Sequence, residues 1–115
     1  MIKYINLTLY KNERREKEHN NVKAVYNNNS YLFNIDDVKT KLNDNYFTRE
    51  TEEYEFILDL INKTASYTLK EKNMSFDIEV EKIIYDKKDE TTTLEYKISS
   101  DEETFKLIIE ENKNE

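Results

Sequence analysis

Two segments of the chain, 53–60 and 74–81, largely alternate apolar with charged or polar residues. In the first, Tyr54, Phe56, Leu58 and Leu60 fall on one side, and Glu53, Glu55 and Asp59 fall on the other. The second sets Met74, Phe76, Ile78 and Val80 against Ser75, Asp77, Glu79 and Glu81. This period of two is that of a strand with one buried face, whereas a helix would bury several of these carboxylates. Both segments are therefore predicted to be strands, with the rings of Phe56 and Phe76 facing the interior.

The same alternation predicts further strands along the rest of the chain. They are centred on residues 5–9, 22–26, 31–35, 38–42, 46–49, 65–69, 94–98 and 105–109. After Val80 the apolar positions move to Ile83 and Tyr85, which predicts an inserted residue, a β-bulge, near Lys82. The polar stretch 11–21 shows no alternation and is interpreted as a long connection.

The chain has no Gly and no Pro, the residues that normally form turns. Asparagine is expected to replace them, because it adopts the left-handed backbone region more readily than any residue except Gly. Asn is found where turns are needed, at 27–29, at 43–45, and at Asn62 and Asn73.

Eight to ten short strands and no helix predict a single all-β domain over residues 1–115, an antiparallel barrel or sandwich. A barrel is favoured, because an open sheet of such strands would leave two unpaired edges without the proline that commonly protects them. The interior of a small barrel is either filled by side chains or holds one small ligand.

The composition narrows the function classes. A net charge of -7 argues against a nucleic-acid partner, because phosphate binding needs a surplus of Lys and Arg on one face. There is no cysteine for a disulfide or a thiolate nucleophile, and no apolar run of about 20 residues for a membrane span. The first residues alternate like a strand, without a signal peptide, so a cytoplasmic protein is expected.

Candidate catalytic and metal-binding residues are sparse. His19, the only histidine, lies in a polar stretch with no nucleophile indicated around it. The acidic stretches 36–37 and 86–90 lack the glycine and the ligand spacing of a calcium loop. No catalytic residue, metal or cofactor is therefore predicted, and the chain is not expected to be an enzyme. A hydrolase with paired carboxylates is the weakest hypothesis, because the alternation points no acidic pair into the interior.

Several short segments follow one another in an order known from another group of proteins. They are Tyr31-Leu32-Phe33 before an acidic pair, Lys39-Thr40-Lys41-Leu42, Arg49, Tyr54-Glu55-Phe56, Tyr67-Thr68, Met74-Ser75-Phe76-Asp77-Ile78 and Leu94-Glu95-Tyr96. In this order the chain resembles the YwiB-like domains of unknown function, bacterial proteins that look like calycins, the barrel superfamily of lipocalins and fatty-acid-binding proteins. The resemblance implies a calycin-like barrel and an interior cavity for a small apolar or aromatic molecule.

Six residues are the candidates for binding such a ligand inside the barrel: Arg49, Tyr26, Tyr31, Tyr54, Tyr67 and Tyr96. Arg49 lies in a strand, where its guanidinium would meet a ligand carboxylate bidentately. The alternative is a surface arginine paired with Glu50, Glu52 or Glu53. The tyrosines are in phase with apolar neighbours, so their hydroxyls would orient a bound molecule, or their rings simply fill the core.

The acidic strand face formed by Asp77, Glu79 and Glu81 is a candidate interaction surface. Its carboxylates repeat at about 7 Å, twice the rise per residue of a strand, which is close to the spacing of phosphates along a nucleic-acid strand. The alternative function is therefore an acidic protein-interaction module, or a nucleic-acid mimic that inhibits a basic partner. A solvated strand would look the same, and Lys70, Lys72 and Lys82 are expected to neutralise part of the face.

Overall fold

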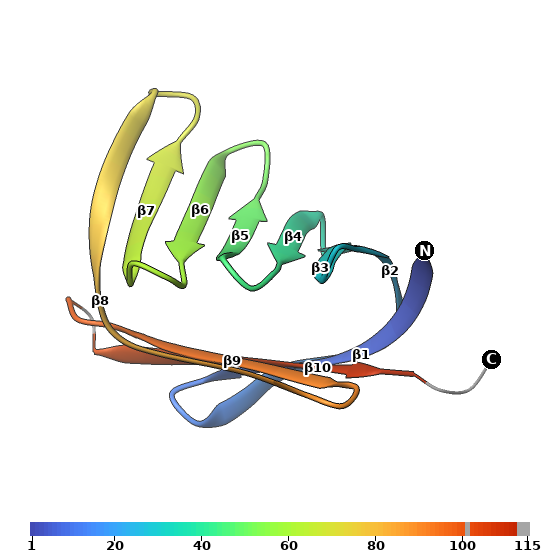
Figure 1. The fold of residues 1–115 in the computed structure, drawn as a ribbon. Helices are drawn as coiled ribbons and strands as arrows, with labels where there is room; N and C mark the ends of the chain where they lie inside the picture. The colour runs from blue at the N-terminus through green and yellow to red at the C-terminus, as the bar shows by residue number, and fades with distance from the viewer. Residues whose placement is uncertain (101, 113–115) are drawn as a thin grey trace.

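The computed structural model describes residues 1–100 and 102–112, which form ten strands and no helix. In chain order the strands are β1 (Ile2–Lys11), β2 (Arg14–Asn27), β3 (Ser30–Ile35), β4 (Val38–Leu42), β5 (Tyr46–Glu50), β6 (Tyr54–Asp59), β7 (Thr64–Leu69), β8 (Met74–Lys88), β9 (Thr91–Ile98) and β10 (Glu103–Glu111). All neighbours pair antiparallel, in the order β1-β10-β9-β8-β7-β6-β5-β4-β3-β2, and the barrel is closed (Figure 1). The predicted all-β antiparallel barrel is confirmed.

The first and last strands close the barrel. β1 pairs with β10 over seven residue pairs, from Ile5 opposite Glu111 to Lys11 opposite Phe105. Leu7 and Ile109, which face each other in this pairing, are both completely buried. The alternation of apolar residues in these two strands therefore places one face of each in the core, as the sequence predicts.

β8 connects the two halves of the barrel. Its first part pairs with β7 up to Glu79, and its second part, from Val80 onward, pairs with β9. The register shifts between Val80 and Lys82, so Glu81 is the extra residue and the predicted bulge is confirmed. In Figure 1, β8 runs down from the row of strands β3–β7 to the layer that contains β9, β10 and β1.

The prediction of a long connection over 11–21 is wrong. β1 continues to Lys11, β2 begins at Arg14, and the two are joined by a two-residue turn. Both turn residues, Asn12 and Glu13, have a positive φ, of 52° and 69°. Residues 12–18 are all exposed, because this end of the β1–β2 ribbon has water on both faces. A strand with two solvated faces carries no apolar alternation.

The waist of the barrel is filled by apolar side chains. The buried core consists of Ile5, Leu7, Ala24, Tyr31, Phe33, Leu42, Phe47, Phe56, Leu58, Ala65, Leu94, Tyr96, Leu107 and Ile109. The Phe47 ring packs against Phe56 and Tyr96, with centroids 6.4 and 6.0 Å apart, respectively. These three aromatic rings occupy space that a deep ligand cavity would need, so the described residues leave no ligand-sized cavity at this level of the barrel.

Candidate functional site

A cleft of about 360 Å³ opens to solvent at one mouth of the barrel. Its walls come from six consecutive strands, β5 to β10, and are formed by Arg49, Tyr54, Phe56, Tyr67, Ile78, Tyr96, Ile98 and Phe105. A second, smaller hollow is lined by Arg49 together with Phe33 and Leu107. Its volume is only about 40 Å³, enough for no more than a few water molecules. The space that a ligand would use is therefore the mouth and not the waist.

A larger depression, of about 680 Å³, lies elsewhere on the surface. Charged side chains line much of it, and two of these, Glu81 and Lys97, are already paired with each other at 3.3 Å. It lacks the continuous aromatic walls that favour a small apolar ligand in the mouth cleft.

Strand register brings the cleft residues to one face. Arg49 is paired with Phe56, Phe56 with Tyr67, and Tyr67 with Phe76 across β5, β6, β7 and β8. Directly opposed residues of antiparallel strands point to the same side of the sheet. The partners of Arg49 in this row are inward positions, which the sequence marks by apolar or aromatic residues. Arg49 therefore also points inward, at the mouth of the barrel.

Flat aromatic rings form two walls of the cleft. Tyr54 and Tyr67 stack with their centroids 5.2 Å apart and their planes 17° from parallel. Tyr96 and Phe105 stack at the same distance, with an angle of 25° between the rings. Stacked rings present planar apolar surfaces, which suit the face of a planar ligand.

Arg49 is a partly buried residue, and no carboxylate among the described residues lies within 4.0 Å of its guanidinium. Its strand neighbour Glu50 instead pairs with Lys70 at 2.5 Å. The alternative in which Arg49 pairs with Glu50, Glu52 or Glu53 on the surface is therefore wrong. A partly buried cation without a counter-ion favours the binding of an anion.

Tyr96 contributes a neutral hydroxyl beside this cation. Burial raises the pKa of the Tyr96 phenol, and the positive charge of Arg49 lowers it by a smaller amount. The phenol therefore stays protonated at neutral pH and keeps a proton that it can donate to a bound oxygen atom.

Tyr26 and Tyr31 do not lie in the cleft, contrary to the sequence prediction. They flank the β2–β3 turn, whereas Arg49 and Tyr54 flank the β5–β6 turn. Successive hairpin turns of an antiparallel barrel alternate between its two ends, so these two pairs of residues belong to opposite ends. Only three of the five candidate tyrosines, Tyr54, Tyr67 and Tyr96, accompany Arg49 in the cleft.

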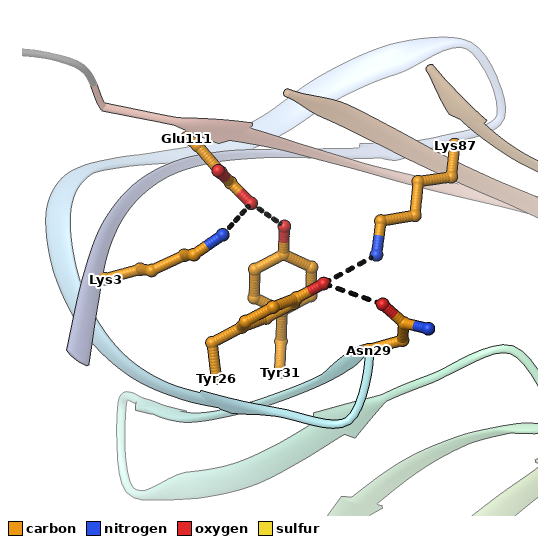
Figure 2. A network of polar contacts seen from close by, with 6 residues as sticks. All are labelled: Lys3, Tyr26, Asn29, Tyr31, Lys87 and Glu111. Atoms are coloured by element: carbon orange, nitrogen blue, oxygen red, sulfur yellow. Dashed lines mark hydrogen bonds and ion pairs between the residues drawn. The ribbon is translucent and has the colours of Figure 1, made fainter. Parts of the chain in front are cut away.

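Polar contacts hold Tyr26 and Tyr31 in place at that opposite end (Figure 2). The Tyr31 hydroxyl donates to the Glu111 carboxylate, and the Lys3 ammonium lies 3.0 Å from the same carboxylate oxygen. The Tyr26 hydroxyl donates to the Asn29 amide oxygen at 3.0 Å, and its ring lies 4.8 Å from that of Tyr31. This network links β1, β2, β3 and β10 and thereby holds the strands together at this end of the barrel.

The charges of the network fit this structural role. Burial and the hydrogen bond to Glu111 raise the pKa of the Tyr31 phenol. Burial alone would raise the pKa of the Glu111 carboxyl, but the Tyr31 hydrogen bond and the Lys3 ion pair outweigh it and lower that pKa. Glu111 is thus ionised and Tyr31 protonated at neutral pH, which is the state that the contact requires.

The acidic face on β8 is less regular than the sequence suggests. Asp77, Glu79 and Glu81 are all exposed, but only Glu81 has an ion-pair partner within the described part of the chain, Lys97. The lysines expected to neutralise this face form no ion pair with it among the described residues. Lys82 pairs with Glu95 instead, and Lys70 pairs with Glu50. Lys72 forms no ion pair with the face in the described part of the chain either. Asp77 and Glu79 remain the unpaired part of the face.

Phe76 corrects a further expectation. It occupies an inward position opposite Tyr67, as predicted, yet 45% of its surface is exposed. Met74, two residues earlier, is equally exposed. The phase of the alternation is right, but no part of the described chain covers this end of β8.

His19 belongs neither to the lining of the mouth cleft nor to the contacts around Glu111. Its Nε2 atom lies 3.8 Å from an Asp36 carboxylate oxygen that Lys17 approaches to 3.0 Å. Among the residues described, no group of three or more His, Cys, Asp or Glu side chains is placed to hold a metal ion. No helix in the described ranges is long and apolar enough to cross a membrane.

Phe56, Ile78, Ile98 and Phe105 line the cleft but were not among the site residues predicted from the sequence. Each is in phase with the apolar alternation of its strand, so the sequence marks it only as an inward position.

Comparisons with protein-family models, curated proteins and solved structures found no match to this chain.

Proposed function

We propose that this protein is a non-enzymatic, calycin-like barrel that binds a small molecule with a planar apolar or aromatic body and an anionic group. The ligand lies in the mouth cleft, with its body against the rings of Tyr54, Tyr67 and Tyr96 and its anion on Arg49. The observation that carries the proposal is that Arg49, a partly buried residue lining an aromatic cleft, has no carboxylate partner in the described chain.

The size and chemistry of the cleft support this ligand class. Its volume of about 360 Å³ lies at the lower end of the range typical of small-molecule sites. Aromatic walls with one charged group are a common composition for such sites, because the walls supply affinity and the charge fixes the orientation. The resemblance to YwiB-like domains belongs to the same proposal, since it implies a calycin-like barrel that binds a small apolar or aromatic molecule.

The test compares two ligands with the same aromatic body, one anionic and one neutral. Naphthoate and naphthylmethanol are titrated into the purified protein by calorimetry, and we expect naphthoate to bind more tightly by about tenfold, the contribution of a charge-assisted hydrogen bond. In Arg49→Gln that preference disappears, while the residual binding of the alcohol is unchanged. Tyr67→Leu should weaken both ligands, because it removes a ring of the wall.

Arg15→Gln is the matched control. Arg15 is exposed on β2 and pairs with Glu18 at 3.1 Å, so its loss changes the net charge equally without touching the cleft. Equal binding of naphthoate by Arg49→Gln and Arg15→Gln would show that the cleft does not recognise the anion. No heat or chemical-shift change with any aromatic carboxylate would exclude ligand binding of this class.

A further inference from the structure

The first part of β8 is a free sheet edge. Residues 74–79 pair with β7 on one side, while β9 begins its pairing on the other side only at Val80. In the described chain, no strand pairs with residues 74–78 on that second side. Figure 1 shows this part of β8 as the outer margin of the row formed by β3–β7.

The backbone groups that face this edge can be identified. In an antiparallel pair, alternate residues direct their N–H and C=O groups to opposite sides of the strand. The Glu79 carbonyl accepts from the Ser99 N–H at 3.0 Å, so Glu79 is directed away from β7. Asp77 and Ser75, two and four residues earlier, have the same direction. Their two N–H and two C=O groups are therefore open to a further strand.

The side chains of this edge are apolar on one face and acidic on the other. On the inner face, Met74 and Phe76 are each 45% exposed, next to the half-buried Ile78. On the outer face, Asp77 and Glu79 have no ion pair within the described residues. A strand that covered this edge would bury the apolar side chains only if its own inward residues were apolar, and would complement the carboxylates only if its outward residues were basic.

We propose that this edge binds an extended segment of a partner protein, in which apolar and basic residues alternate, by addition of a β-strand. Main-chain hydrogen bonds to Ser75 and Asp77 supply part of the affinity, and the alternation of side chains supplies the specificity. Pairing with a second copy of the same edge is disfavoured, because it would place the carboxylates of the two copies side by side on chains that each carry a net charge of -7.

The test uses synthetic peptides of one composition and two orders. A capped, fluorescein-labelled hexapeptide of alternating Lys and Val is compared with one in which three Lys are followed by three Val. We expect saturable binding of the alternating peptide, at least about tenfold tighter than the block peptide, because only the alternating one matches the period of a strand. Binding should weaken as salt rises, since exposed charge pairs are screened.

Two variants locate the binding to the edge. Asp77→Pro removes an N–H that faces the open side, so it costs no hydrogen bond to β7 but blocks a new strand, and we expect at least about a tenfold loss of affinity. The double variant Asp77→Lys, Glu79→Lys should reverse the preference, from the Lys–Val peptide to a Glu–Val peptide. Arg49→Gln should leave peptide binding unchanged, which separates this site from the cleft.

Circular dichroism and urea unfolding verify that each variant is folded. Equal binding of the alternating and block peptides would overturn the proposal, because the interaction would then be electrostatic attraction without strand pairing. It would also be overturned by binding that survives Asp77→Pro, by no binding of the alternating peptide, or by sedimentation as a dimer that Asp77→Pro dissociates.

Discussion

Single residues close one end of the barrel, and Glu111 is the clearest case. Its carboxylate accepts a hydrogen bond from Tyr31 on β3 and forms an ion pair with Lys3 on β1. One side chain near the end of β10 therefore links three strands. We expect Glu111→Gln to lower the free energy of unfolding at neutral pH by about 1–3 kcal/mol, the usual contribution of hydrogen bonds to a charged group. Urea unfolding measures the difference, and Glu110→Gln, which changes an exposed neighbour, is the control.

The effect of Glu111 should depend on pH. The folded-state pKa of Glu111 lies below the ordinary glutamate value of 4.5, so the ionised form is favoured by folding. This contribution is fully present above the ordinary pKa and is lost as the pH falls through the folded pKa. The stabilities of the wild-type protein and Glu111→Gln should therefore converge in acid. A difference that stays constant from neutral pH into acid would contradict the assigned ion pair.

Glu13 occupies a turn position with a positive φ, where glycine would be more stable. It has a φ of 69° in the β1–β2 turn, a backbone region that is unfavourable for residues with a Cβ atom. We expect Glu13→Gly to raise the free energy of unfolding by about 0.5–1 kcal/mol, since relief of strain exceeds the extra flexibility of the unfolded chain. Glu16→Gly, inside β2, is the control and should destabilise. Equal effects of the two changes would exclude the backbone explanation.

At the scale of elements, the sequence predicts most strands but not all turns. Asn28, Asn29 and Asn73 have a positive φ, as expected from the chemistry of Asn. Lys63, and not Asn62, takes this conformation after β6, because hairpin register decides which residue falls at the tip. The 43–45 turn uses Asn differently, since the Asn43 side chain accepts hydrogen bonds from the backbone of Asn45 and Tyr46. Local chemistry therefore predicts where turns occur, and strand pairing determines their geometry.

The bulge in β8 adds one residue to the strand where it passes from β7 to β9. Glu81 is the inserted residue between Val80 and Ile83, and the bulge accommodates it while both of these side chains face the interior. Deletion of Glu81 would place Val80, Ile83 and Tyr85 two residues apart, so all three would still face the interior. We expect it to destabilise the protein by about 1–3 kcal/mol, because it removes the bend and the extra twist that the bulge gives β8 where the strand passes from β7 to β9. Chemical denaturation followed by circular dichroism measures the loss.

Glu81→Ala separates the backbone from the side chain. This variant keeps the inserted residue and removes only a surface ion pair with Lys97, so its effect should stay within about 0.5–1 kcal/mol. A deletion as mild as this substitution would mean that β8 does not need the bulge to pass from β7 to β9.

At the scale of the whole molecule, the site depends on barrel closure, which a strand pattern alone does not determine. The sequence marks Tyr26 and Tyr54 identically, as rings in phase with apolar neighbours. The order of the hairpin turns assigns these two tyrosines to opposite ends of the barrel. The hydrogen bond from Tyr31 to Glu111, 80 residues later in the chain, joins β3 to β10 at the end that contains Tyr26. The exposure of Phe76 has the same origin, because its cover would have to come from a strand beyond the end of β9.

The complete barrel should fold without a proline-limited phase. Closure requires β1 to pair with β10, nearly the full chain length away, so folding in milliseconds to seconds is expected for this topology. The chain has no Pro and no Cys, which removes the two covalent processes that commonly slow refolding to tens of seconds or longer. In a double-jump experiment, the refolding amplitudes should therefore not depend on how long the protein stays in denaturant. A slow phase that grows with that delay would require a slow equilibrium in the unfolded chain that this sequence does not provide.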